Sequence, residues 1–133
     1  DVERSRGLGD VYKRQLEVGK KLVDYCKSGN VSKAVETLYS PDIESHEAMS
    51  MPGMPARSKG LDAVRKKNKD WEESMEVHES QVDGPFPLDD RFAVHFKYDA
   101  TSKKDNKRMK MEEVALYTVK DGKIIKEEFF YTM

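Results

Sequence analysis

The spacing of apolar residues predicts helices in the first half of the chain. From Leu16 to Leu38, apolar side chains recur every three or four residues, which is the period of a helix with one buried face. Gly29 interrupts this pattern, and glycine commonly ends a helix, while Asn30 is a favourable cap for the next one. The sequence therefore predicts two packed helices, the second of which ends before Pro41.

A third helix is predicted from Leu61 to about Ser74. Its inward positions, three or four residues apart, are Leu61, Val64, Asn68 and Trp71. Its charged residues are predicted to form a solvated face: Arg65, Lys66, Lys67, Lys69 and Asp70. Asn68 is the polar exception on the buried face, so its amide is either hydrogen-bonded to neighbouring backbone or directed into a cavity.

A loop separates the second helix from the third. A short strand is predicted at 42–47, and the segment SMPGMP that follows excludes both a helix and a central strand. Three methionines make this loop apolar and adaptable: Met49, Met51 and Met54. Two interpretations remain open, a flap over a pocket and a loop packed only by its own side chains.

The pattern of apolar and polar residues in the second half of the chain predicts strands. Residues 75–82 alternate in part, and residues 92–98 alternate clearly between apolar and polar side chains. Between 107 and 131, two runs rich in Val, Ile, Phe and Tyr flank Asp121-Gly122, which is a strong signal for a hairpin. Helices followed by strands indicate an α+β domain, with the helices packed on one face of a mainly antiparallel sheet.

Residues 1–15 show neither helical nor strand periodicity. The run DVYKRQ within them resembles the translation of a transposon end used in preparing sequencing libraries. We therefore expect residues 1–15 to be a non-native or disordered tail, and we place a single domain at 16–133.

The amino-acid composition limits the class of protein but says little about its function. The chain has 133 residues, which suits one domain, and its 24 Lys and Arg nearly balance 25 Asp and Glu. No global field therefore favours nucleic acid or an anionic membrane, and no apolar run is long enough to span a bilayer. A single cysteine, Cys26, cannot form an internal disulfide and is interpreted as a core residue. We expect a cytoplasmic protein with neither a nucleic-acid nor a membrane partner.

Four segments between Leu16 and Met133 carry a resemblance to a known family: LYSPDIESHE, the Gly60-Leu61 helix with Trp71, DRFAVHFKY, and EEVALYTVKDGKI followed by EEFFY. In this order and spacing they resemble the SnoaL-like branch of the nuclear transport factor 2-like superfamily. The resemblance implies a cone, in which three N-terminal helices pack in the concave face of a strongly bent sheet, with a pocket at the open end and often a homodimer across the outer sheet face. The same cone serves isomerases, cyclases, hydrolases, dehydratases and binding proteins, so the fold does not decide the function.

The predicted hairpin carries the leading candidate for chemistry, Glu113. If Gly122 lies in a bulged turn, one face carries Met109, Met111, Glu113, Ala115, Tyr117, Ile125, Glu127, Phe129 and Tyr131. A two-residue turn would shift the register and bring Glu128 and Phe130 to that face. An apolar cone would raise the pKa of Glu113 toward neutrality, which suits a general base or a hydrogen-bond acceptor for a ligand. The alternative for Glu113 is a structural pair with Arg or Lys.

His46 is the second candidate acid or base, because the resemblance places it where related cyclases and isomerases carry a polar pocket residue. The ketosteroid isomerase pattern itself fails, since its aspartate would fall about Ser45 and its tyrosine about Leu22. Adjacent His-Glu pairs on strands point to opposite faces, so no metal site is predicted. The glycines lie singly at turns, so no nucleotide cofactor is predicted either.

We therefore predict a cofactor-free domain that binds a small, largely apolar molecule. Its expected ligand-binding residues are Tyr25, Met49, Asn68, Trp71, Phe96, Met111, Tyr117, Glu127, Phe129 and Tyr131. Two alternatives remain. One is an isomerase, cyclase or hydrolase in which Glu113 or His46 moves a proton, and the other is a dimerisation module whose cavity has collapsed.

Overall fold

The computed structural model describes residues 2–132, with side chains from residue 9 onward. The helices are α1 (Val2–Lys27), α2 (Val31–Leu38) and α3 (Leu61–Ser74). The strands are β1 (Tyr39–His46), β2 (Arg57–Lys59), β3 (Met75–Leu88), β4 (Arg91–Ser102), β5 (Lys107–Lys120) and β6 (Lys123–Phe130). Among the described residues, no helix is both long and apolar enough to cross a lipid bilayer.

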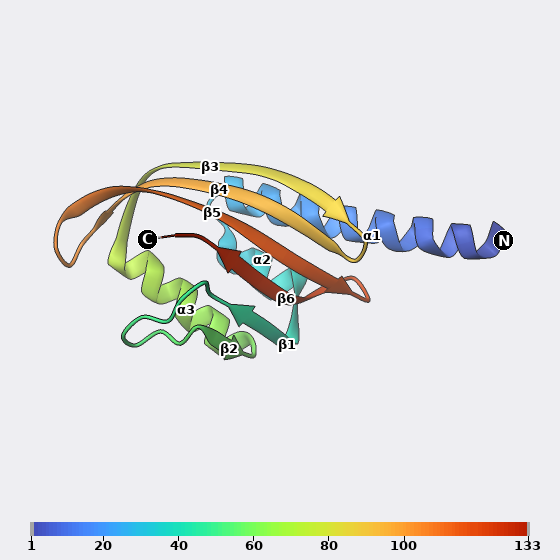
Figure 1. Cartoon of the computed structure of the whole chain (residues 1–133), viewed down its shortest axis with the longest axis horizontal. Helices are drawn as coiled ribbons and strands as arrows, with labels where there is room; N and C mark the ends of the chain where they lie inside the picture. The colour runs from blue at the N-terminus through green and yellow to red at the C-terminus, as the bar shows by residue number, and fades with distance from the viewer. Residues whose placement is uncertain (1, 133) are drawn as a thin grey trace.

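The strands form one six-stranded sheet in the order β2-β1-β6-β5-β4-β3. All neighbouring strands are antiparallel except β1 and β6, which run parallel. The long strands β3, β4 and β5 curve over α1 and α2, while α3 lies beside β1 and β2 (Figure 1). The predicted α+β fold, with helices on the concave side of a bent and mainly antiparallel sheet, is confirmed.

The core lies between the helices and the inner face of the sheet. Alternate residues of β4 are buried, namely Phe92, Val94 and Phe96, and they meet Leu22 and other apolar residues of α1. The ring of Phe92 stacks on that of Tyr117 in β5, with 5.0 Å between centroids. The period-two pattern of the sequence therefore identifies the face of the sheet that is covered.

The segment predicted as a tail is helical in the structure. Helix α1 begins at Val2 rather than near Leu16, and its N-terminal half projects beyond the strands (Figure 1). Val11 and Tyr12 are exposed there, so these two apolar side chains do not contribute to a buried face. Gln15 differs, because it is only 1% exposed and its side-chain amide donates a hydrogen bond to the carbonyl of Arg91. The native or non-native origin of residues 1–15 stays a prediction.

The register of the β5–β6 hairpin combines the two predicted alternatives. Asp121 and Gly122 both have positive φ, 52° and 77°, and they form a two-residue turn between Lys120 and Lys123. An irregularity then follows, because Ile124 pairs with Val119 but Lys126 pairs with Thr118. Ile125 is thus an extra residue on β6, and it returns the strand to the register predicted for a bulged turn.

The bulge decides which acid faces inward. Glu127 and Phe129 share the inner face with Tyr117 and Ala115, to which they are paired, whereas Glu128 is on the outer face. The predicted inner face is therefore right at these positions and wrong at Ile125, since Ile124 is the buried residue.

Candidate functional site

A buried carboxylate, that of Glu127, lies on the inner face of β6 and is only 2% exposed. The hydroxyl of Tyr39 donates a hydrogen bond to Oε2, and the hydroxyl of Ser45 donates one to Oε1 over 2.8 Å. Ser45 reaches this oxygen because the parallel pairing of β1 with β6 places it beside Glu127. Both oxygens have donors, which compensates the loss of water around the group.

Lys67 brings a positive charge to the same place. Its Nζ lies 3.5 Å from Glu127 Oε1 and 2.9 Å from Glu47 Oε2, and it also donates a hydrogen bond to the Ser45 hydroxyl. The ammonium is 4.5 Å from the centroid of the Phe129 ring, within the range of a cation–π contact. The predicted solvated position of Lys67 is wrong, since its side chain is only 12% exposed. Lys67 follows Val64 by three residues and therefore shares the buried face of α3.

Glu47, the first residue after β1, links this cluster to the end of the chain. The hydroxyl of Tyr131 donates to Glu47 Oε1 over 3.1 Å, and Lys67 occupies Oε2. The backbone N–H of Glu47 donates to the carbonyl of Ala56 across the base of the methionine loop. A continuous hydrogen-bonded chain, which we call the inner network, thus joins Tyr131, Glu47, Lys67, Ser45, Glu127 and Tyr39.

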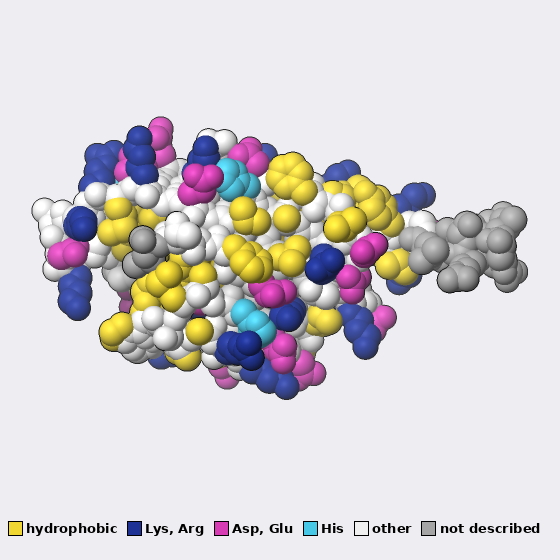
Figure 2. All heavy atoms as spheres, in the orientation of Figure 1, with side chains coloured by type: hydrophobic (Ala, Val, Ile, Leu, Met, Phe, Trp, Pro, Cys, Tyr) yellow, Lys and Arg dark blue, Asp and Glu magenta, His cyan; other side chains and the backbone are white. Residues whose placement is uncertain are grey.

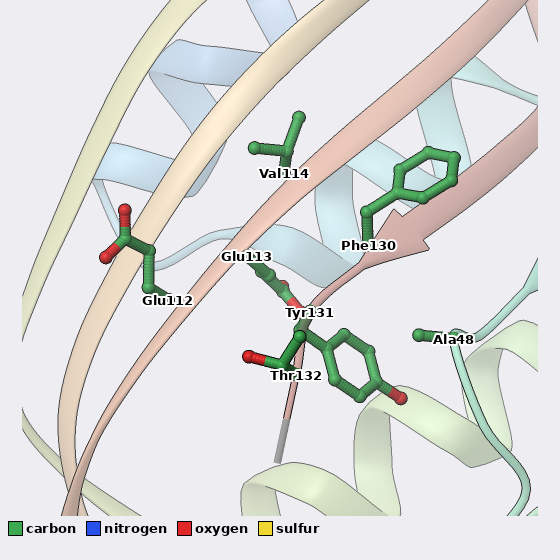
Figure 3. Close-up of a pocket in the computed structure, with 7 residues that line it drawn as sticks. All are labelled: Ala48, Glu112, Glu113, Val114, Phe130, Tyr131 and Thr132. Carbon is green, nitrogen blue, oxygen red and sulfur yellow. The ribbon is translucent and has the colours of Figure 1, made fainter.

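An open cleft of about 470 Å³ adjoins the inner network where β5 and β6 meet the C-terminal residues. It is lined by Ala48, Glu112, Glu113, Val114, Phe130, Tyr131 and Thr132. Glu113 points toward Tyr131, whereas Val114 and Phe130 point away to the other side of the sheet (Figure 3). The cleft therefore combines two acidic groups, those of Glu112 and Glu113, and one phenol with apolar residues.

Glu113 is the carboxyl group of this region that lacks a donor. It is half-buried, and among the described residues it forms no ion pair and accepts no hydrogen bond. Burial raises its pKa to about 7, the charges of Glu47 and Glu127 add to the rise, and the ammonium of Lys67 opposes it. A carboxyl group with this pKa both gives and accepts protons near neutral pH.

Aromatic rings from four elements stand around these charged groups. The Trp71 and Tyr98 centroids are 5.4 Å apart, and those of Tyr117 and Phe129 are 6.5 Å apart in an edge-on arrangement. Phe96 stacks on Tyr98 at 6.0 Å. Phe96 and Tyr117 are each only 3% exposed and Trp71 is 37% exposed, so two of the predicted ligand contacts are packed core residues and one lies at the surface.

The structure separates the two predicted acid–base residues. His46 pairs with Glu128 on the outer face of the sheet, and its ring lies 3.9 Å from Glu44. It lines a second open cleft of about 430 Å³ together with Arg57 and Glu128. Glu113 belongs to the inner face, so the structure does not bring it together with His46.

The other predicted contacts are more scattered. Tyr25 is partly buried and packs against the core, and Met49, Asn68 and Met111 are half-buried outside the inner network. Cys26 packs against the core as interpreted, and burial raises the pKa of its thiol to about 12, with a further rise from the charge of Glu127. Among the described residues, no three His, Cys, Asp or Glu side chains are grouped so as to hold a metal ion.

Four members of the inner network were not among the predicted site residues: Tyr39, Ser45, Glu47 and Lys67. Strand alternation with the buried Ile43 carries a signal for Ser45, and helical spacing carries one for Lys67. Ser45 occupies the position at which the ketosteroid isomerase pattern would carry an aspartate. Here the buried carboxylate comes instead from Glu127 on the adjacent strand.

Comparison with known proteins assigns the family. Residues 14–131 match the model of the SnoaL-like domain. A crystal structure from Mesorhizobium loti, provisionally assigned as a SnoaL-like polyketide cyclase, shares 43% sequence identity over 86% of this chain and 97% of that chain, with a TM-score of 0.81. This chain belongs to the SnoaL-like family.

Other solved structures share the fold at low sequence identity. A protein from Bacillus subtilis, provisionally assigned as an isomerase, is 14% identical over 92% of this chain and 88% of that chain, with a TM-score of 0.73. TerC, co-crystallised with polyporic acid, is 15% identical over 90% of this chain and 91% of that chain, with a TM-score of 0.70. At such identities the likeness shows the fold alone. The comparison with curated proteins finds no match.

Proposed function

We propose that this SnoaL-like chain binds a small, uncharged and largely apolar organic molecule in the cleft beside Glu113. The observation that carries the proposal is the position of a half-buried, donor-free carboxyl group beside the Tyr131 ring in an open cleft that Ala48 also lines, with Val114 and Phe130 at its edge. Ligand sites in proteins commonly combine apolar surface with a few polar groups that fix orientation.

The charges near the cleft favour an uncharged ligand. Three carboxyl groups, those of Glu47, Glu113 and Glu127, share one nearby ammonium, that of Lys67. An anionic ligand would add like charge in a region of low dielectric, where Coulomb repulsion is stronger than in water. Neutral molecules with one hydrogen-bonding end and an apolar body fit this arrangement best.

Membership of the SnoaL-like family supports a small-molecule role of this general kind. TerC, a protein of the same fold, has been co-crystallised with an organic molecule, polyporic acid. Its 15% identity carries no ligand over to this chain.

A second candidate function, cofactor-free acid–base catalysis, is favoured by the pKa of Glu113. A pKa of about 7 leaves both protonation states populated at neutral pH, which is the condition for efficient general acid–base catalysis. An isomerase, a cyclase or a hydrolase would each use Glu113 to move a proton to or from the bound molecule. His46 stays a weaker candidate for this role because it faces away from the inner network.

Native mass spectrometry of the chain purified from a cell extract tests the proposed binding. We expect a consistent extra mass on the parent and on Glu72→Gln, a matched surface control, since Glu72 is exposed on α3. Ala48→Trp, which would fill the cleft, should lose that mass. A mass retained equally by Ala48→Trp places the ligand elsewhere and overturns the proposal.

Once the ligand is identified, the same protein can be tested for catalysis. A Glu113→Gln variant that still binds the ligand but no longer converts it would favour the enzyme.

We further propose a homodimer through the outer face of the sheet. Val114 and Phe130 are paired across β5 and β6 and are 40% and 53% exposed. Figure 2 shows apolar side chains gathered over the middle of this face, between the two histidines in view.

A cytoplasmic location remains our expectation, because the single cysteine needs no oxidising compartment.

A further inference from the structure

Counting hydrogen-bond donors distinguishes the three carboxyl groups of the site. Glu127 accepts bonds at both oxygens, from Tyr39 at Oε2 and from Ser45 at Oε1. Glu47 also accepts at both oxygens, from Tyr131 at Oε1 and from Lys67 at Oε2. A carboxyl group with donors at both oxygens is held in its ionised form, because a proton there would displace a donor.

Glu113 is different, since none of the described residues donates a hydrogen bond to it. Its oxygens remain free to carry a proton or to meet a ligand in the cleft. The geometry alone therefore distinguishes two carboxyl groups that have donors at both oxygens, Glu47 and Glu127, from one that has none, Glu113.

The difference between Glu113 and the other two carboxyl groups depends on Lys67. Its ammonium contacts both ionised groups, at 2.9 Å from Glu47 and 3.5 Å from Glu127, and its side chain is only 12% exposed. The face of the Phe129 ring holds it in place. Without this charge, two carboxylates would remain close together with reduced access to water, and one of them would gain a proton.

We propose that Lys67 is the positioning residue of this site: by holding Glu47 and Glu127 in their ionised forms, it leaves Glu113 as the carboxyl group that exchanges a proton with a ligand. The inference rests on the proposed function in one respect, which is that a ligand occupies the cleft beside Glu113. Lys67 itself does not line the cleft, so it acts through the carboxylates.

The other groups that face Glu113 do not compete for this role. They come from β4, β5 and the C-terminal residues, and they are Tyr98, Tyr117 and Tyr131. Burial is the first cause that raises the pKa of each of these groups, so all three remain neutral through the range in which a carboxyl group titrates. Lys67 therefore provides the charge that decides where the proton resides.

The test is a titration of side-chain carboxyl groups by ¹³C NMR on the whole, ligand-free chain. In the parent we expect one carboxyl group to titrate near neutral pH and to disappear in Glu113→Gln. In Lys67→Met we expect two carboxyl groups rather than one to titrate near neutral pH, because three neighbouring carboxyl groups would be left without an opposite charge. Lys67→Arg keeps the charge and should titrate like the parent.

A double variant reports on the two ionised groups. Lys67→Met with Glu113→Gln should show a new carboxyl titration near neutral pH, belonging to Glu47 or Glu127, that Glu113→Gln alone lacks. Because the double variant carries one acidic group fewer than Lys67→Met, its remaining carboxylates repel one another less. It therefore provides the test if Lys67→Met does not fold. The inference is overturned if the neutral titration of the parent persists in Glu113→Gln, or if a folded Lys67→Met titrates as the parent does.

These measurements need no ligand, so they separate the inference from the proposed function. A cleft that retains no molecule would overturn the proposed function while leaving the titrations as predicted. Conversely, a retained ligand with unshifted titrations in Lys67→Met would preserve the binding function and remove Lys67 from it.

Discussion

The hydroxyl of Ser45 on β1 donates a hydrogen bond to Oε1 of Glu127 on β6, over 2.8 Å, where these two strands pair in parallel. This contact connects Glu127 to the rest of the inner network, because Ser45 also accepts a hydrogen bond from Lys67. The stability of the buried carboxylate therefore depends on a small hydroxyl group.

Ser45→Ala should destabilise the protein. The substitution leaves Glu127 Oε1 with only the longer contact to Lys67, at 3.5 Å, and a buried acceptor that loses its donor costs about 1–3 kcal/mol. Urea denaturation followed by circular dichroism measures the loss in the free energy of unfolding. Ser50→Ala, at an exposed position in the loop, is the matched control and should be nearly neutral. Equal stability of the two variants would contradict the role given to Ser45.

Glu113 should make stability fall as the pH rises. Its pKa is raised from 4.5 to about 7 in the folded chain, so between these values the folded state binds more protons than the unfolded state. The stabilisation is fully present below pH 4.5 and is lost as the pH passes through 7, with a total on the order of 2–3 kcal/mol. Glu113→Gln removes this dependence.

The measurement is the free energy of unfolding of the parent minus that of Glu113→Gln, taken from about pH 4 to about pH 8 so that the range spans both pKa values. We expect the difference to decline with rising pH and then to level off. A difference that stays constant, or that rises with pH, would show that Glu113 is not held in its protonated form by the fold.

Phe130→Lys should abolish the proposed homodimer. Phe130 is 53% exposed on the outer face, beside Val114, and a lysine there would place charge in the middle of an apolar interface. Light scattering at micromolar concentration measures the mass of the particle. Phe86→Lys is the control, since Phe86 is 58% exposed but lies near the end of β3. A parent chain that is already monomeric would rule out this interface.

Gly19→Ala should destabilise the contact between α1 and the sheet. A methyl group at Gly19 would lie 2.8 Å from Cβ of Pro85 and 3.2 Å from the Phe92 ring, so the helix would have to shift. Overpacking of this kind costs about 1–3 kcal/mol. Gly9→Ala on the same helix meets nothing within 4 Å and should instead gain up to about 1 kcal/mol from helix propensity. Thermal unfolding of both variants would reveal opposite shifts, and parallel shifts would contradict the close approach.

Local periodicity explains which elements were predictable. Helix α3 runs from Leu61 to Ser74 as predicted, because its apolar spacing and the preceding glycine are local signals. The alternation from Phe92 to Tyr98 likewise identified the buried face of β4. The N-terminal half of α1 was missed because its sequence has no helical apolar period, and its described apolar residues Val11 and Tyr12 are exposed where the helix projects beyond the strands.

The candidate site was only half predictable, and the reason is its long-range assembly. Glu113 and Tyr131 were found because an acid and a phenol in a strand are conspicuous. Their partners were not, since Tyr39 and Ser45 meet Glu127 across 88 and 82 residues of sequence. Lys67 was assigned to solvent by its charge, and only the folded chain shows that three acidic groups lie within its reach.

The extra residue in β6 sets a limit on how this hairpin can evolve. Because successive strand residues face opposite sides, incorporating Ile125 into a regular ladder opposite Thr118 would turn Glu127 outward and bring Glu128 to face Tyr39 and Ser45. Deleting Ile125 would instead leave Lys126 opposite Thr118 and Glu127 opposite Tyr117, so the acid would stay on the inner face. We therefore expect relatives that keep this acid either to carry the bulge or to lack its extra residue, and an alignment of SnoaL-like chains would test that spacing. In this segment, loss of one residue is compatible with the buried acid, whereas loss of the bulge at constant length is not.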